Sequence, residues 1–170
     1  MVRAITVLLF VLVLAIPAMA QDDYPRIEVG MGYSNIGFPT GVPGQTEHHS
    51  GFAMSTGFNL SRMFGFENYT GFYSLGNSTT LISNIFDGKA VWRSGGKVVP
   101  YGVAGIGISY ATSGYYSSGS ALSTRIGLGA DVPLNDAMSL NFDISRMGFH
   151  FGAWSSGVNF TTGIVFTLSN

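Results

Sequence analysis

Residues 122–132 read LSTRIGLGADV, and this stretch decides the fold class. Its two parities carry different residues: Leu122, Ile126, Leu128, Ala130 and Val132 alternate with Ser123, Arg125, Gly127, Gly129 and Asp131. Successive side chains of a strand point to opposite faces. The stretch therefore predicts a β-strand with one apolar face and one face that is small or polar.

The same alternation recurs along the rest of the chain. It occurs in segments 27–34, 52–61, 66–73, 80–92, 101–110, 138–145 and 158–168. It is less regular in 66–73 and weakest in 80–92, where Leu81, Ile85 and Val91 blur it. No segment after residue 20 repeats with the 3.6-residue period of a helix. The sequence predicts an all-β chain of eight strands, each about as long as a membrane-crossing strand of roughly 9 to 11 residues.

The first 20 residues have the pattern of a cleaved signal peptide. Arg3 is followed by a nearly unbroken apolar run at 5–16 and then by the small-x-small sequence Ala18-Met19-Ala20. The run is too short for a membrane-spanning helix, which needs roughly 20 residues. We expect residues 1–20 to be removed and residues 21–170 to form one barrel domain.

Composition excludes several classes of protein. The 170 residues include no Cys, which rules out disulfide scaffolds and cysteine zinc sites. Eight basic residues balance nine acidic ones, so nucleic acid is not an expected partner. A mean hydropathy of +0.30 with only 10% charged residues indicates apolar surroundings.

The two faces of the strands indicate what those surroundings are. A soluble sandwich turns its polar face to water, where Lys and Glu are common. Here the polar face is mostly Gly, Ser, Asn, Thr and Tyr, which suits the interior of a narrow barrel. The apolar face would then meet lipid, where only helices and closed barrels satisfy every backbone polar group. The sequence predicts a closed eight-stranded antiparallel up-and-down transmembrane β-barrel.

Gaps between the segments suggest an orientation. The gaps at 61–64, 93–97 and 133–137 are short, while 36–50, 112–121 and 148–156 are mostly longer, with 75–79 as the exception. Outer-membrane barrels have short periplasmic turns and longer external loops, so both termini are expected in the periplasm. Two aromatic girdles are predicted: Phe64, Phe66 and Trp92 near the short turns, and Tyr33, Phe149 and Trp154 near the long loops.

Several motifs resemble a known family. They are 64–67 (FGFE), 99–107 (VPYGVAGIG), 127–132 (GLGADV) and 162–166 (TGIVF). In these motifs, and by pattern over 27–168, the chain resembles the bacterial outer-membrane β-barrel domain family of small OmpA/OmpX-type barrels. The resemblance implies an eight-stranded barrel in the outer membrane of a Gram-negative-type bacterium.

One departure from the family concerns the C-terminus. Members usually end at an aromatic residue read by the barrel-assembly machinery, an expected partner of this chain. Here Phe166 is followed by Thr167-Leu168-Ser169-Asn170. A weaker or displaced assembly signal is therefore expected.

Charged residues on the inward parity are the first candidate site. They are Arg26, Glu28, Glu67, Lys89, Arg125, Asp131 and Asp143. An eight-stranded barrel is just wide enough for side chains to fill it, and unpaired charge there is costly. We interpret the set as a structural network of paired charges, with an ion pathway or gate as the alternative. Arg125 is expected to balance some of Glu28, Glu67, Asp131 and Asp143, and the sequence does not choose among them.

Arg146 is the second candidate, because it interrupts the apolar parity after Phe142 and Ile144. It lies eight residues beyond Met138, about 26 Å along a strand at roughly 3.3 Å per residue. With strand tilt, this is near the outer edge of an apolar band about 25 Å tall. Its guanidinium would there pair with a lipopolysaccharide phosphate or snorkel to water.

A catalytic site is not expected. His48-His49-Ser50 follows Glu47, but neighbouring strand residues point to opposite faces and the surrounding Gly, Pro and Thr offer little support. His150 has no partner that can be identified from the sequence. We therefore predict no metal and no cofactor.

Three roles remain open. The first is a structural or surface-interaction barrel with a plugged lumen, whose loops meet an extracellular ligand. The others are a narrow channel for ions or small solutes, and a lipid-modifying enzyme.

Overall fold

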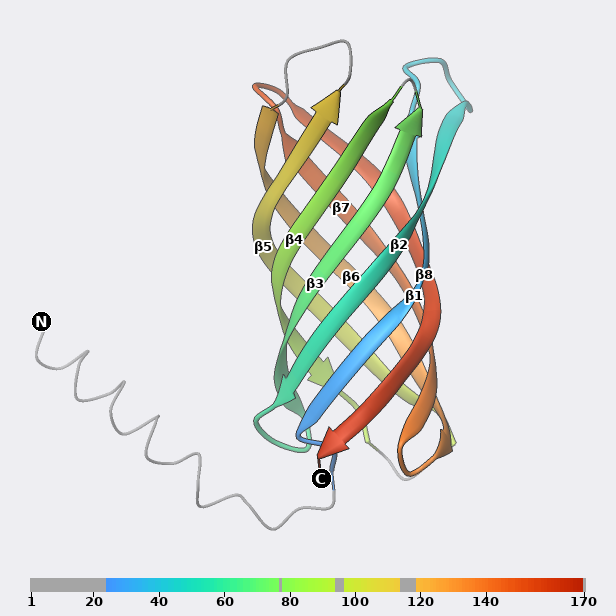
Figure 1. The fold of residues 1–170 in the computed structure, drawn as a ribbon, viewed down its shortest axis with the longest axis vertical. Helices are drawn as coiled ribbons and strands as arrows, with labels where there is room; N and C mark the ends of the chain where they lie inside the picture. Colours follow the sequence, from blue (N-terminus) through green and yellow to red (C-terminus); the bar gives the residue numbers. More distant parts are fainter. Residues whose placement is uncertain (1–23, 77, 94–96, 114–118, 170) are drawn as a thin grey trace, which may run out of the picture.

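The computed structural model describes residues 24–76, 78–93, 97–113 and 119–169. It has eight strands (Figure 1): β1 (Ile27–Pro39), β2 (Thr46–Asn59), β3 (Phe64–Gly76), β4 (Thr79–Val91), β5 (Val99–Ser113), β6 (Gly119–Asn135), β7 (Met138–His150) and β8 (Trp154–Ser169). The signal peptide predicted at residues 1–20 lies outside the described residues. The described residues include no helix long and apolar enough to span a membrane.

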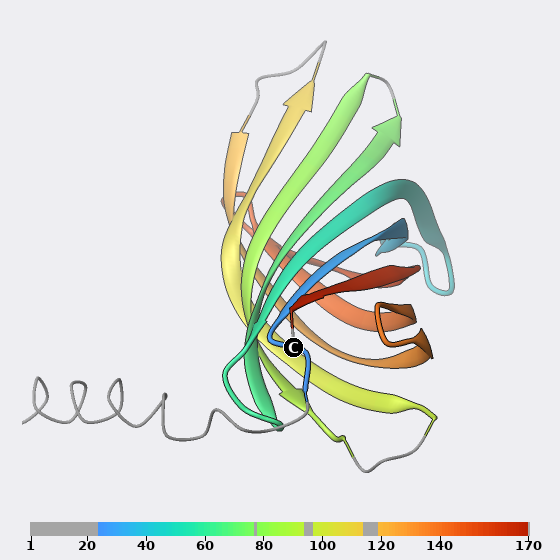
Figure 2. The same cartoon turned by 60° about the horizontal axis from the view of Figure 1, so that its bottom comes forward.

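Each strand pairs antiparallel with its neighbours in the chain, and β8 pairs back onto β1. The predicted closed eight-stranded antiparallel barrel is confirmed. Figures 1 and 2 show the strands inclined to the barrel axis, with the end of β8 beside the start of β1. We call this the termini end and the opposite one the far end. Following the register once around from Ile27 returns to β1 at Gly37, ten residues further along, which is the stagger that tilted strands produce.

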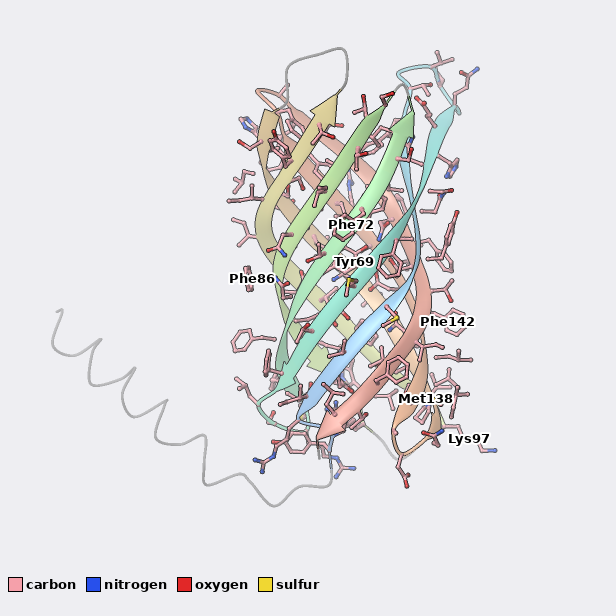
Figure 3. The ribbon with its side chains drawn as sticks, viewed as in Figure 1. Tyr69, Phe72, Phe86, Lys97, Met138 and Phe142 are labelled. Atoms are coloured by element: carbon pink, nitrogen blue, oxygen red, sulfur yellow. The ribbon has the colours of Figure 1, made fainter. Side chains whose placement is uncertain are left out.

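The two faces are divided as the sequence predicts. Apolar side chains cover the outside: Phe86 is 67% exposed and Leu128 65%. Figure 3 shows Phe86 and Phe142 projecting away from the barrel on either side. Small polar side chains lie inside, and Ser83 and Ser109 are fully buried. This is the reverse of a soluble barrel, whose large apolar residues point inward.

The strands are longer than predicted, with 13 to 17 residues each. β1 continues to Pro39 and β2 begins at Thr46, so most of the predicted loop 36–50 is strand. The connector at 92–98, at the termini end, is longer by one residue than the one at 40–45, and the predicted asymmetry of connector length is therefore wrong. Polar residues continue the ladder outside the apolar band because backbone pairing does not require apolar side chains.

The lumen also contains more apolar residues than predicted. Leu81 and Ile85, which blur the pattern of β4, point inward and pack with Ile36, Met147 and Phe149. Phe149 is 1% exposed, so its predicted place in an outer aromatic girdle is wrong. Its ring packs against Phe38 with centroids 5.7 Å apart, inside the far end of the barrel.

The face assignment can be tested with one charge at two depths. Ile106→Arg on β5 should destabilise the protein in bilayers by about 2–4 kcal/mol, because it places a cation near the bilayer midplane. Ser120→Arg, exposed near the far end of β6, should cost about 0–1 kcal/mol. Urea unfolding in lipid vesicles measures both, and equal costs would contradict the assignment.

Candidate functional site

Six of the seven charged residues predicted to face inward meet in the lumen, together with one that was missed. This lumen cluster consists of Glu28, Glu67, Asp87, Lys89, Arg125, Asp131 and Asp143. All are buried, and they come from β1, β3, β4, β6 and β7. The cluster therefore ties together strands that do not pair with each other.

Arg125 is at the centre of one half of the cluster. Its Nη1 lies 2.5 Å from Asp87 Oδ2 and 3.2 Å from Glu67 Oε1, and its Nη2 lies 3.0 Å from Asp143 Oδ1. Nε donates to Ser145 Oγ at 3.3 Å. The guanidinium also stacks over the ring of Tyr69, 4.1 Å from its centroid. Contacts on every side hold this cation in one orientation.

Lys89 organises the other half. Its Nζ lies 3.4 Å from Glu67 Oε2, 3.8 Å from Glu28 Oε2 and 3.9 Å from Asp131 Oδ2. It also lies 4.4 Å from the centroid of the Tyr101 ring. Glu67 accepts one cation on each carboxylate oxygen and so joins the two halves.

The lumen cluster has five carboxylates and two cations, and neutral donors stabilise part of the excess negative charge. Asn59 Nδ2 donates to Glu28 at 3.0 Å, and Asn141 Nδ2 donates to Asp131 at 2.7 Å. Such hydrogen bonds to ionised acceptors are stronger than neutral ones. Glu28 and Asp131, which lie 3.8 and 3.9 Å from the Lys89 ammonium, therefore each accept a hydrogen bond from an amide side chain.

A neutral polar network lies on the far-end side of the charges. Ser34, Tyr73 and Asn159 meet there: Tyr73 donates to Asn159 Oδ1 at 3.0 Å and Ser34 to the same atom at 2.9 Å. Tyr69 bonds Tyr73 at 2.8 Å and connects this network to Arg125. A cavity of about 30 Å³ remains beside Tyr69 and Asp143, enough to hold a water molecule.

Two predictions about the charged residues need correction. Arg26 precedes β1 and is exposed at the termini end, so it is not enclosed in the lumen as predicted. Asp87 was not predicted as a member, although its parity matches Ser83 and Lys89. The apolar neighbours Leu81 and Ile85 obscured the pattern of this strand, and parity alone would have identified Asp87.

The histidines are dispersed. His48 lies on the outer face and bonds Asn35 Oδ1 at 3.0 Å, whereas His49 packs its ring against Phe38. His150 stacks edge-on against Trp154 at the far end. The described residues contain no group of acids and histidines arranged to hold a metal ion.

Arg146 lies on the outer face of β7, exposed as predicted. Its Nη2 donates to Ser156 Oγ of β8 at 3.0 Å. Two surface hollows adjoin it, one of about 440 Å³ towards Trp154 and one of about 410 Å³ towards His48. A cation between two hollows is the second candidate site.

The family model for the outer membrane protein beta-barrel domain matches residues 6–168. The chain belongs to this family. Its members are barrels of Gram-negative outer membranes, which agrees with the predicted localisation and with the resemblance seen in the sequence. No curated protein matches the chain.

Solved structures of outer-membrane barrels share the fold. The Neisserial surface protein A, NspA, aligns with a TM-score of 0.69 at 11% identity, covering 84% of this chain and 97% of that one. Ail, the attachment invasion locus protein of Yersinia pestis, gives 0.57 at 16% identity, with the same coverage. OprG from Pseudomonas aeruginosa gives 0.55 at 10% identity and covers 86% and 97%. At these identities the likeness concerns the fold alone.

The pairing inside the lumen can be tested by double-mutant cycles. Arg125→Met should cost about 3–5 kcal/mol, because it leaves buried carboxylates uncompensated. Arg125 should couple by about 0.5–3 kcal/mol to Asp87→Asn, Glu67→Gln and Asp143→Asn.

Glu28→Gln is the matched control for these cycles, since Glu28 contacts Lys89 and not Arg125. The change that Glu28→Gln makes in the free energy of unfolding should depend on whether Lys89→Met is present. The changes made by Glu28→Gln and Arg125→Met should be nearly additive. Additivity of Arg125 with all three of its acids would contradict the geometry.

Proposed function

We propose that this protein is a non-conducting outer-membrane barrel with a structural or surface-interaction role. The observation that carries the proposal is the continuous series of side chains along the lumen. On β4 alone the inward residues from the termini end are Val91, Lys89, Asp87, Ile85, Ser83 and Leu81, and each is at most 5% exposed. An ion would meet an apolar, a charged and a second apolar layer in turn.

The mouth at the termini end supports the same conclusion. Tyr24 is 4% exposed, and its hydroxyl donates to the carbonyl of Leu60 at 3.2 Å. Asn59 Nδ2 donates to the carbonyl of Pro25 at 2.7 Å, which fixes the segment before β1 to the end of β2. The guanidinium of Arg93, which follows β4, lies 5.8 Å from the centroid of the Tyr24 ring. These contacts at the termini end, together with Phe38 and Phe149 packed inside the far end, support a plugged lumen.

We further propose that the termini end faces the periplasm. Connector lengths no longer support this orientation, but the outer faces of the strands do. At the far end the β1–β2 hairpin carries outward polar residues such as Asn35, His48 and Ser50, so it extends beyond the apolar band. At the termini end Phe64 and Leu168 are still exposed and apolar. Outer-membrane barrels project further on the external side.

The far end is then the surface available to an external ligand. Its hairpins are rich in Gly, Ser and Thr, whose small polar side chains adapt to different contacts. Among the similar structures, Ail has been described in complex with the heparin analogue sucrose octasulfate. That complex supports a ligand-binding role for a barrel of this fold.

The proposal includes no catalytic step. His48 and His49 lie on opposite faces of β2, and the only ion pair that involves a histidine among the described residues is His49 with Glu47 at 3.7 Å. We also propose that the barrel-assembly machinery reads β8, with exposed Leu168 beside Phe166 in place of a terminal aromatic residue.

Planar-bilayer recording tests whether the lumen conducts. The refolded protein should give no reproducible openings, because the inward side chains of β4 are buried along its whole length. Tyr73→Ala, which removes a buried ring from the neutral network, is the variant for comparison and should conduct more than the parent. Ohmic openings of the unmodified protein would overturn the plug and favour the narrow channel.

Arg146 is proposed to bind a phosphate of lipopolysaccharide, with the two adjoining hollows taking acyl chains. Arg146→Gln should lower the thermal stability more in bilayers that contain lipopolysaccharide than in zwitterionic ones, because a charge-assisted contact is lost only in the former. Lys97→Gln, at the termini end (Figure 3), is the matched control and should show no such difference. Equal losses for Arg146→Gln in both bilayers would leave an arginine that only snorkels to water.

A further inference from the structure

The outer surface near the termini end has an apolar groove of about 530 Å³. Its floor consists of outward residues of β4 and β5 that have little or no side chain, namely Gly88, Ala90, Gly102 and Ala104. Phe64 and Phe66 of β3 form one wall, and Ile126 and Leu128 of β6 form the other. Four strands of the lipid-facing surface therefore build one depression.

The depression is open space and not a tightly packed contact. The atom nearest to a Cβ added at Gly88 would be the carbonyl oxygen of Ala104, at 3.8 Å. The lumen-facing glycines differ: a Cβ on Gly105 would lie 2.2 Å from Asp87. Packing therefore requires Gly105 to be small, whereas a larger residue would fit at Gly88.

The volume and lining of the groove suit a hydrocarbon chain. At roughly 30 Å³ per methylene, about the volume of a water molecule in the liquid, the groove holds on the order of fifteen methylenes. Almost all of its lining is apolar or backbone, and Lys89 reaches it only from β4, with its ammonium in the lumen. Acyl chains are the apolar chains present at this depth of a bilayer.

Two turns that adjoin the groove each carry an arginine. Leu60 and Phe64, which line it, flank Arg62 in the β2–β3 turn. Arg93 follows Trp92, whose ring lies 3.8 Å from the position of a Cβ on Gly102 in the floor. Arg62 Nη2 donates to the carbonyl of Arg93 at 3.2 Å, and Arg93 Nη1 donates to the carbonyl of Arg62 at 2.6 Å. The two turns thus lie side by side next to the groove, and each guanidinium bonds the backbone of the other turn.

Two adjacent cations favour an anion. The Arg93 guanidinium lies 5.8 Å from the centroid of the Tyr24 ring, and among the ion pairs of the described residues neither Arg62 nor Arg93 pairs with a carboxylate. Each guanidinium has five N–H donors, and the reciprocal bonds use one of each. Phosphate oxygens suit the remaining donors, because planar arginine forks bind phosphate with two parallel bonds. An indole is also a typical neighbour at the headgroup level of a membrane.

We propose that this groove binds an anionic phospholipid, with one acyl chain along the floor and the phosphate on Arg62 and Arg93. Charge complementarity selects an anionic lipid over a zwitterionic one or a second copy of the protein. The site lies at the opposite end of the barrel from Arg146 and does not depend on the role proposed for the far end.

The fluorescence of Trp92 reports directly on the lipid beside it, because the chain has only two tryptophans and the other can be replaced. In a Trp154→Phe background, the protein is refolded in vesicles of phosphatidylcholine that contain increasing amounts of phosphatidylglycerol with brominated chains. Bromine quenches Trp92 only from an adjacent lipid. We expect phosphatidylglycerol to be preferred beside Trp92 by roughly fivefold or more, as for one to two basic residues at an anionic surface.

Three variants and two matched controls test the two parts of the site. Arg62→Gln should reduce the preference by roughly fivefold, Arg62→Lys should retain most of it, and Lys97→Gln should leave it unchanged. Lys97 makes the same change of charge at the same end (Figure 3) but does not line the groove. Gly88→Leu should fill the floor and lower the quenching, whereas Ala130→Leu, on the lipid face outside the groove, should not. Folding of each variant is checked by its heat-dependent gel mobility.

Two results would overturn the proposal. Quenching that follows the bulk lipid composition would mean that the groove holds ordinary, unselected lipid. In the other result, neither lipid quenches Trp92 until the protein is diluted in the bilayer. That result would mean that a second copy of the protein covers the groove.

Discussion

A chain that crosses hydrocarbon with strands has no water to satisfy its backbone, so the last strand must pair with the first. The β1–β8 seam is where this constraint is met. Gly32 and Gly163 face each other across it, and a Cβ on either would lie 2.2 Å from a carbonyl oxygen of the other strand. The seam is therefore tight, and the closure of the barrel depends on glycine in both strands.

Closure with eight strands fixes the width of the lumen, and the width determines what the interior can contain. Buried side chains line the lumen along β4, and a cavity of about 30 Å³ lies beside Tyr69 and Asp143. In such a space a cation is stable only when it is surrounded. Arg125 has three carboxylates, a hydroxyl and an aromatic ring around it, while Lys89 has three carboxylates and a ring. These contacts also join strands that share no backbone hydrogen bonds.

The outer surface follows a different requirement, because lipid accepts any apolar shape. A surface made only of large residues would meet lipid evenly all around the barrel. Among the described residues, the surface departs from this in the groove near Arg62 and Arg93 at one end and in the hollows beside Arg146 at the other. Each combines small residues with a cation near the edge of the apolar band. Lipid selection at the two ends of the barrel would then rest on the same chemistry.

The sequence by itself determined the eight strands, their faces and six of the seven members of the lumen cluster. These follow from parity, which is a local property: residue 125 faces inward because residues 123 and 127 do. The signal peptide predicted at residues 1–20 stays a prediction. Only the tertiary structure decided which acids Arg125 binds, that Phe149 points inward, that Arg26 remains outside and that the strands continue past the apolar band. It also decided the groove, whose residues come from four strands. The reason is the stagger of ten residues around the barrel, which sets the height at which residues of distant strands meet and leaves no trace in the pattern of any one strand.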